Sequence, residues 1–245
     1  MTARRLRMFA GPNGSGKSTI KSIISSNLLG HYLNPDDIEK QVRQQGYYDL
    51  RSLDIRTDQE EILAFFKNHP LAARLEDFDL LYGIRYIDKG FIDFADVGFN
   101  SYLSAILTDF LRHKLLDSGQ SFTFETVMSS ADKVLLLQKA QELGYRTYLY
   151  YVATEDPFIN LSRIRHRVRQ GGHPVPDEKV VERYYRSLRL LSEAIRATNR
   201  AYLFDNSGES KVWVAEITAG TDVVIKTDRL PEWVRKYVLE TQEKI

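Results

Sequence analysis

The sequence predicts an α/β protein whose mainly parallel sheet lies between two layers of helices. Strand and helix patterns alternate along the chain, and a glycine-rich segment directly follows the first strand. With 43% hydrophobic and 27% charged residues, the chain has the composition of a soluble protein with one large core. We therefore expect a single domain over residues 1–245, with its functional residues at the carboxyl ends of the strands.

The first expected strand is short and buried. Residues 5–10 alternate and then become apolar before Gly11. A helix should begin at Pro35, because proline suits a first helical turn and the acidic Asp36 and Asp37 suit its positive end. This would place Asp36 at the carboxyl edge of the sheet. The elements expected up to this point are a strand over 5–10, a helix over 17–29, a strand over 32–34 and a helix from 35.

Residues 47–100 interrupt this pattern. They carry six basic against eleven acidic residues, and their periodicity is irregular apart from a helical piece over 58–67. We interpret this segment as an acidic, mainly helical insertion.

Alternation returns after residue 100. The expected elements are a helix over 101–116, a strand over 121–125, a helix over 131–143, a strand over 145–152, helices over 156–170 and 177–199, a strand over 202–205, a hairpin over 212–217 and 223–225, and a helix from 231. Residues 161–200 carry ten basic against four acidic residues, which favours an anionic partner. We interpret 156–199 as an arginine-rich, lid-like helical segment. The net charge of only +1 favours nucleotide phosphates over nucleic acid as that partner.

Composition also limits where the protein works. No apolar stretch approaches the roughly 18 residues that span a bilayer, so we expect no membrane partner. The basic N-terminus lacks a secretory apolar region, and we expect the mature chain to begin at or near Met1. The absence of cysteine excludes disulfides and thiolate metal sites and suits a cytoplasmic location.

Residues 11–18 match G-x-x-x-x-G-K-[ST] in full, between an expected strand and an expected helix. This is the phosphate-binding P-loop: backbone amides surround the phosphates, Lys17 reaches the β and γ phosphates, and Ser18 binds Mg²⁺. The alternative is a glycine-rich turn with an exposed lysine. We expect ATP and Mg²⁺ as cofactors. The expected nucleotide-binding residues are Gly11, Asn13, Gly14, Ser15, Gly16, Lys17, Ser18 and Thr19.

Two acidic residues at strand ends could complete a site for phosphoryl transfer. Asp36 could accept the proton of an attacking hydroxyl, or either Asp36 or Asp37 could cap the helix, with Asp37 the preferred cap. Glu125 could hold Mg²⁺ or bind substrate, with hydroxyls from Thr126 and Ser129 nearby. Glu125 could instead face solvent, or orient a hydrolytic water.

Arginines in the lid-like segment could stabilise the charge of a transferring phosphoryl group. Arg163 and Arg167 share one helix face, and Arg165 and Arg169 share another. We expect a catalytic role for Arg163 and Arg167, with Arg183 as a further candidate; the alternative is a solvated basic face.

Two further residues remain open from the sequence. His173 could contact substrate or fix a turn. Asn206, just after a late strand, could bind the nucleotide's base or belong to a simple turn.

The sequence resembles the zeta toxin family of P-loop kinases. The resemblance rests on GPNGSGKST at 11–19, NPDD at 34–37, FET at 124–126, RIRHRVRQGGHPVP at 163–176, ERYYRSL at 182–188 and FDNSG at 204–208. Zeta toxins phosphorylate a hydroxyl of UDP-N-acetylglucosamine and are restrained by an antitoxin protein. The resemblance implies that Lys17 binds phosphate, that Asp36 is the base, and that Glu125 contacts substrate or Mg²⁺. It also implies that Arg163 and Arg167 contact the γ-phosphate.

Two features differ from the family pattern. The toxins have a motif closer to Asp-Gly-Asp where this chain has Asn34-Pro35-Asp36, and their core lacks the 47–100 insertion. Both features flank the expected substrate pocket.

From these observations we expect an ATP- and Mg²⁺-dependent phosphotransferase that acts on a hydroxyl of a small molecule, with a UDP-amino sugar as the favoured acceptor. The alternatives are an NTPase that hydrolyses ATP without transfer, and a nucleotide-regulated module that binds nucleic acid or protein.

Overall fold

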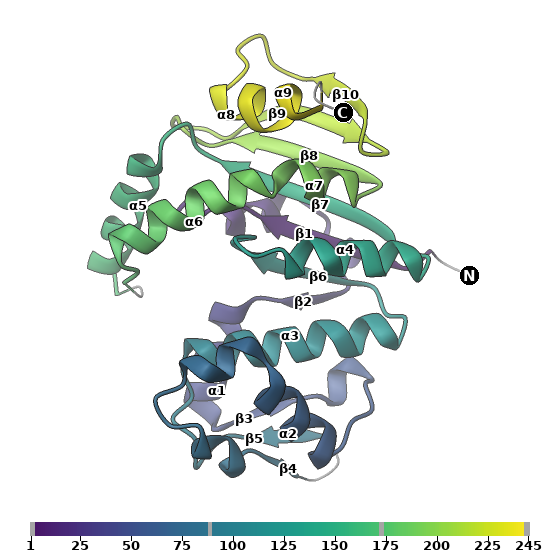
Figure 1. Ribbon diagram of the computed structural model, residues 1–245, viewed down its shortest axis with the longest axis vertical. Helices are drawn as coiled ribbons and strands as arrows, with labels where there is room; N and C mark the ends of the chain where they lie inside the picture. Colours follow the sequence, from purple (N-terminus) through teal and green to yellow (C-terminus); the bar gives the residue numbers. More distant parts are fainter. Residues whose placement is uncertain (1–2, 88–89, 172–173, 243–245) are drawn as a thin grey trace. The chain divides into compact units, whose positions relative to one another are not determined.

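The computed structural model describes residues 3–87, 90–171 and 174–242 (Figure 1). The chain divides into two compact units. The first comprises Met1–Leu29 and Glu125–Ile245, and the second comprises Gly30–Phe124. The second unit is larger than the 47–100 insertion expected from charge and pattern.

Seven strands form one sheet in the order β10-β9-β8-β7-β1-β6-β2. They are β1 (Arg5–Ala10), β2 (His31–Leu33), β6 (Phe122–Thr126), β7 (Arg146–Ala153), β8 (Arg200–Asp205), β9 (Val212–Thr218) and β10 (Asp222–Ile225). β7 pairs in parallel with β1 and β8, and β2 with β6, whereas β8, β9 and β10 pair antiparallel. The predicted α/β class, mainly parallel sheet and C-terminal hairpin are confirmed.

Helices of the first unit cover the sheet. They are α4 (Asp132–Glu142), α5 (Pro157–Arg169), α6 (Asp177–Arg189) and α7 (Leu191–Arg196), and Figure 1 shows α4, α6 and α7 on the same face of β7. The single helix predicted over 177–199 is thus two helices. At Leu190 ψ is −9°, away from the helical value, and the turn lets Leu191, Ala194 and Ile195 pack in the core.

The helix predicted over 17–29 is instead two short 3₁₀ helices, η1 (Lys17–Ile23) and η2 (Ser26–Leu28). Hydroxyl side chains account for part of this difference. Thr19 Oγ1 donates to Gly16 O over 2.8 Å, and Ser22 Oγ donates to Thr19 O over 2.7 Å. Such bonds compete with the α-helical hydrogen-bond ladder.

The helix predicted from residue 231 is present but irregular. It comprises α8 (Glu232–Val234), a π-helical segment η6 (Arg235–Leu239) and α9 (Glu240–Gln242). Trp233 holds this helical segment on the first unit. The centroid of its buried indole lies 5.9 Å from that of the Tyr151 ring, and its Nε1 donates to Asp205 Oδ2 over 2.9 Å.

In the second unit, α1 (Pro35–Gln45) begins with proline at its first position, as predicted. The predicted strand is displaced by one residue, because Asn34 leaves β2 to cap α1 and accepts a hydrogen bond from Asp36 N over 2.9 Å. The expectation that Asp37 or Asp36 caps this helix is therefore wrong. The Asn34 amide oxygen does so and leaves both carboxylates exposed.

The rest of this unit contains more strand than the sequence predicted. The helices are α2 (Gln59–Asn68), α3 (Ser101–Asp117) and the 3₁₀ turns η3 (Arg51–Leu53), η4 (Pro70–Arg74) and η5 (Asp79–Gly83). The strands β3 (Tyr47–Asp49), β5 (Phe91–Asp93) and β4 (Arg85–Ile87) form an antiparallel sheet. The sequence predicted both α2 and α3, but three-residue strands are too short to show an alternating pattern, so it revealed none of β3, β4 and β5. Among the described residues, no helix is long and apolar enough to cross a bilayer.

Candidate functional site

The loop between β1 and η1 has a backbone shape that only glycine adopts readily. Gly14 has φ +76° and Gly16 has φ +92°. A Cβ atom on Gly14 would lie 2.6 Å from the backbone oxygen of Asn160, and one on Gly16 would lie 2.4 Å from Asn206 Nδ2. Glycine is thus required at positions 14 and 16 both by the backbone angles and by close neighbours.

Lys17 lies along the loop that it follows. Its Nζ donates to Gly11 O over 2.8 Å and to Pro12 O over 3.0 Å. An ammonium group held at the mouth of a P-loop is suitably placed to bind phosphate oxygens.

Ser18 and Glu125 come together from different parts of the first unit. Ser18 Oγ donates to Glu125 Oε2 over 3.3 Å, and Glu125, near the end of β6, is only 6% exposed. A hydroxyl and a carboxylate are both hard oxygen ligands, which suit Mg²⁺. The sequence predicted both residues as metal ligands, and their proximity fits such a pair.

Two further loop side chains carry buried polar atoms. Among the described residues, Asn13 Oδ1 and Ser15 Oγ have no hydrogen-bond partner. Buried polar atoms are nearly always paired, and exceptions often lie at functional sites.

The sequence did not identify Asn160, which joins α5 to the P-loop. Asn160 is fully buried, its Nδ2 donates to Asn13 O over 2.7 Å, and its Oδ1 accepts from the Thr154 hydroxyl. Tyr184 of α6 donates to Thr154 O over 2.6 Å, and burial raises the pKa of its phenol, which therefore stays a donor. Asn160 shares a helix face with the buried Leu161 and Ile164. A polar residue on an otherwise apolar helix face is the sequence signal that could have identified Asn160 as a functional residue.

The loop between β8 and β9, residues 206–211, also holds the P-loop. Asn206 Nδ2 donates to Ser15 O over 2.8 Å, and Lys211 Nζ donates to Gly16 O over 3.3 Å and to the Thr19 hydroxyl. Ser207 Oγ donates to Asp205 Oδ2 over 3.0 Å, so this segment also forms the turn that was the alternative reading of Asn206. No sequence signal indicated Lys211.

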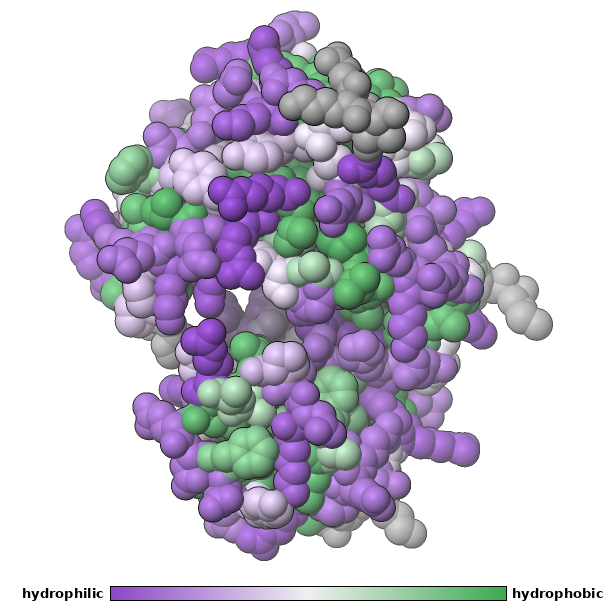
Figure 2. Space-filling view, in the orientation of Figure 1, coloured by the Kyte–Doolittle hydropathy of each residue, from purple (hydrophilic) through white to green (hydrophobic). Residues whose placement is uncertain are grey.

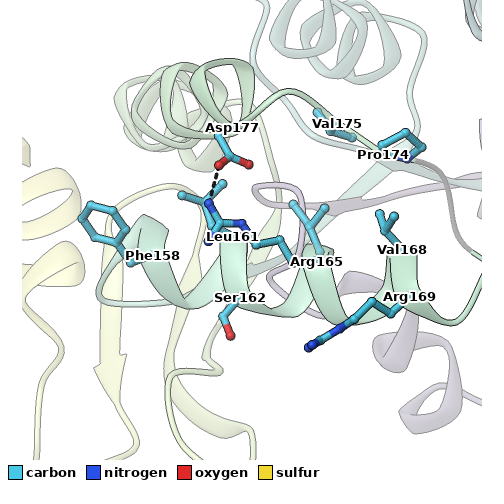
Figure 3. Close-up of a pocket in the computed structure, with 10 residues that line it drawn as sticks. Phe158, Leu161, Ser162, Arg165, Val168, Arg169, Pro174, Val175 and Asp177 are labelled. Atoms are coloured by element: carbon cyan, nitrogen blue, oxygen red, sulfur yellow. Dashed lines mark hydrogen bonds and ion pairs between the residues drawn. The ribbon is translucent and has the colours of Figure 1, made fainter.

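The arginines of α5 divide between two faces, as their spacing predicts. Arg163 Nη2 donates to Gly208 O over 3.3 Å, while its Nη1 is buried without a partner among the described residues. Arg165 and Arg169 instead line a groove of about 530 Å³ between α5 and residues 174–177 (Figure 3). Arg165 forms an ion pair with Asp177 across this groove.

Apolar side chains line part of this groove, among them Leu161, Val168 and Val175 (Figure 3). Leu161, Ile164 and Val180 form the small core that joins α5 to α6. Figure 2 shows that the surface over these two helices is mostly hydrophilic. Most of the charged side chains on α5 and α6 are exposed.

The remaining candidates lie as follows. Arg167 is exposed on α5, and Arg183 is partly exposed on α6. Thr126 Oγ1 accepts from Met128 N over 3.0 Å, which fixes the turn after β6, and Ser129 is partly exposed. Asp36 is exposed in the first turn of α1. His173 lies outside the described residues. The catalytic and substrate-binding roles of these residues stay predictions.

The fold and the loop geometry together define a P-loop protein of the α/β class. A model of the zeta toxin family matches residues 76–218, more than half of the chain. The chain therefore belongs to the zeta toxin family. The match begins after both the P-loop and Asp36, so it does not itself cover those residues.

Individual relatives are distant. A 74-residue segment, 30% of this chain, is 31% identical to an uncharacterized protein of Haemophilus influenzae and spans about half (53%) of that relative's length.

Among solved structures, the AvrRxo1-ORF1:AvrRxo1-ORF2 complex with sulphate ions has a TM-score of 0.53 at 15% identity, covering 99% of this chain and 63% of that one. The AvrRxo1-ORF1:-ORF2 structure with ATP gives a TM-score of 0.52 at 16% identity, with the same coverage. The structure described for the PezAT chromosomal toxin-antitoxin system of Streptococcus pneumoniae gives 0.52 at 14% identity, covering 100% and 86%. At these identities the likeness establishes the fold.

Proposed function

We propose that this protein is an ATP- and Mg²⁺-dependent phosphotransferase that acts on a hydroxyl of a small substrate. The observation that carries the proposal is the complete P-loop motif with Ser18 Oγ 3.3 Å from Glu125 Oε2. A phosphate-binding loop with a paired hydroxyl and carboxylate is the arrangement that a magnesium-bound nucleotide requires. Membership of the zeta toxin family supports a kinase over other P-loop activities.

In this proposal the P-loop amides and Lys17 bind the phosphates, and Ser18 and Glu125 hold the metal. Mg²⁺, when bound, neutralises part of the phosphate charge. Arg163 and Arg167 of α5 contribute positive charge for the transferring group.

Asp36 is the proposed base. Its carboxylate is exposed in the first turn of α1, and the family resemblance supports this role. Asp36 takes the proton of the acceptor hydroxyl while that oxygen bonds to the γ-phosphorus. The bond from the γ-phosphorus to the β–γ bridging oxygen breaks, and ADP leaves with the electron pair.

The acceptor we propose is a nucleotide sugar, with a UDP-amino sugar such as UDP-N-acetylglucosamine as the first choice. This choice rests on the family resemblance. We also propose an antitoxin protein as partner, because the structural neighbour PezAT is described as a toxin-antitoxin system.

The test is to incubate the protein with Mg²⁺, γ-labelled ATP and a panel of nucleotide sugars, and to follow label into acceptors and free phosphate. Asp36→Asn should abolish transfer while ADP binding persists. Asp37→Asn is the matched control, since Asp37 is equally exposed in the same helical turn and removing it costs the same charge. Full transfer in Asp36→Asn, or equal loss in both variants, would refute Asp36 as the base.

Two other outcomes favour the rival functions. Free phosphate that depends on Lys17 but appears without any labelled acceptor would favour a hydrolysing NTPase in which Glu125 orients water. Tight binding of single-stranded DNA that weakens steeply with salt, without transfer, would favour the nucleic-acid module.

A further inference from the structure

A second lysine lies on the P-loop, contributed by the loop between β8 and β9. Lys211 Nζ donates to Gly16 O over 3.3 Å and to Thr19 Oγ1. Lys17 Nζ instead lies at Gly11 O and Pro12 O, at the start of the same loop. The two ammonium groups therefore occupy opposite ends of the P-loop.

We propose that Lys211 is a second phosphate-binding cation, which contacts the α- and β-phosphates of a bound nucleoside di- or triphosphate. This inference rests on the proposed nucleotide site and adds a residue from outside the motif. In a P-loop the backbone cradles the α- and β-phosphates while the motif lysine reaches the β- and γ-phosphates. A cation beside Gly16 and Thr19 is thus placed near the α-phosphate, which Lys17 does not reach.

The surroundings of Lys211 favour an anionic ligand. Its side chain is partly buried, and this desolvation lowers the pKa of its ammonium group. The two P-loop acceptors of its hydrogen bonds, a carbonyl and a hydroxyl, are both neutral. A partly desolvated cation with neutral partners gains more from a phosphate oxygen than a solvated surface lysine does.

Lys211 is also held in place by its own loop. Asn206, at the other end of residues 206–211, donates to Ser15 O over 2.8 Å. Between them, Gly208 O accepts from Arg163 Nη2 over 3.3 Å. These bonds fix both ends and the middle of the loop on the first unit, so little conformational freedom is lost when Lys211 binds phosphate.

The experiment is calorimetric titration of the full chain with ADP, AMP and adenosine. Lys211→Met removes the charge but keeps most of the side-chain stem, and Lys211→Arg keeps the charge. Lys226→Met is the matched control, because Lys226 follows β10 in the same unit but pairs with Glu216 and the Trp213 ring. All variants are first compared by thermal unfolding.

Lys211→Met should weaken ADP binding about tenfold or more, the usual effect of losing a hydrogen bond to a charged group. The ADP affinities of Lys211→Arg and Lys226→Met should stay within about threefold of the wild-type value. A tenfold change in affinity corresponds to about 1.4 kcal/mol of binding free energy. Adenosine binding should not change in any variant, which would place the contact on the phosphates.

Equal ADP affinity in Lys211→Met and wild type would overturn the inference, as would an equal loss of adenosine and ADP binding. A wild-type protein that binds no nucleotide would overturn both this inference and the proposed function. Nucleotide binding that depends on Lys211, without transfer to any acceptor, would sustain the inference and refute only the phosphotransferase.

Discussion

Replacing Asn160 tests whether α5 controls the shape of the P-loop. Asn160 is fully buried, and its Nδ2 donates to Asn13 O over 2.7 Å. In Asn160→Ala the Asn13 carbonyl loses this partner, which costs about 1–3 kcal/mol of unfolding free energy. The void left by the carboxamide adds about 1 kcal/mol. The total, about 2–4 kcal/mol, corresponds to a fall in melting temperature of roughly 4–16 °C for a unit of this size.

The same change should weaken ADP binding. A P-loop released from Asn160 must be ordered again when nucleotide binds, and one neutral hydrogen bond corresponds to an affinity loss of about three- to tenfold. Asn160→Asp isolates the donor, because it keeps an oxygen for the Thr154 hydroxyl but removes the NH₂ group that faces Asn13 O. It should lower ADP affinity at least as much as alanine does.

The assay is thermal unfolding with ADP titration of each variant well below its melting temperature. Asn199→Ala is the control: Asn199 Oδ1 accepts from Thr147 N over 2.8 Å in the same unit, away from the P-loop. It should lower the melting temperature without changing ADP affinity. A destabilised Asn160→Ala protein with wild-type ADP affinity would refute the argument that α5 holds the loop.

Two further variants test other parts of the site. Glu125→Gln keeps an oxygen for the Ser18 hydroxyl but loses the negative charge. The Mg²⁺ concentration for half-maximal transfer should therefore rise about 10- to 100-fold, while metal-free ADP binding stays unchanged. An unchanged Mg²⁺ dependence would exclude Glu125 from the metal site. Gly14→Ala should cost at least about 1–2 kcal/mol from its left-handed φ alone and should also abolish ADP binding, because its Cβ would meet Asn160 O. Gly144→Ala, with φ +79° and no described atom within 4 Å of its Cβ, should show the unfolding penalty in a melt but bind ADP normally.

Local signals account for what the sequence predicted well. The strand before Gly11 and the helix that begins at Pro35 both follow from neighbouring residues, and both appear where expected. The P-loop was recognisable for the same reason: its glycines have positive φ angles, which other residues rarely adopt, so the turn leaves a local mark in the sequence.

Features that depend on distant residues could not be predicted. Lys211 reaches Gly16 across 195 positions of sequence, and Asn206 reaches Ser15 across 191, so no spacing rule connects them. The sequence contains only a weak signal for Asn160, which is the one polar residue among the buried positions of α5. The split at Leu190 likewise follows from how Leu191 and its neighbours pack, which local helix propensity does not contain.

Arg163 and Arg167 of α5 should differ in their effect on ADP binding. Arg163 Nη2 bonds Gly208 O in the β8–β9 loop, whose Asn206 bonds Ser15 O in the P-loop. Arg163→Ala should therefore loosen the P-loop and weaken ADP binding by about two- to tenfold, the range for one lost hydrogen bond. Arg167, exposed one turn further along the helix, has no such link to the loop among the described contacts.

Arg167→Ala should therefore leave ADP affinity unchanged and lower only the rate of transfer, since an arginine that acts on the transferring group contributes in the transition state. Calorimetry with ADP and a single-turnover assay with labelled ATP separate the two effects. If Arg163→Ala binds ADP as tightly as wild type while Arg167→Ala binds it more weakly, Arg167 holds the nucleotide and the β8–β9 loop does not transmit the effect of Arg163. Equal ADP affinity in both variants with equal loss of transfer would mean that Arg163, like Arg167, acts only on the transferring phosphoryl group and not also through the ground-state shape of the P-loop.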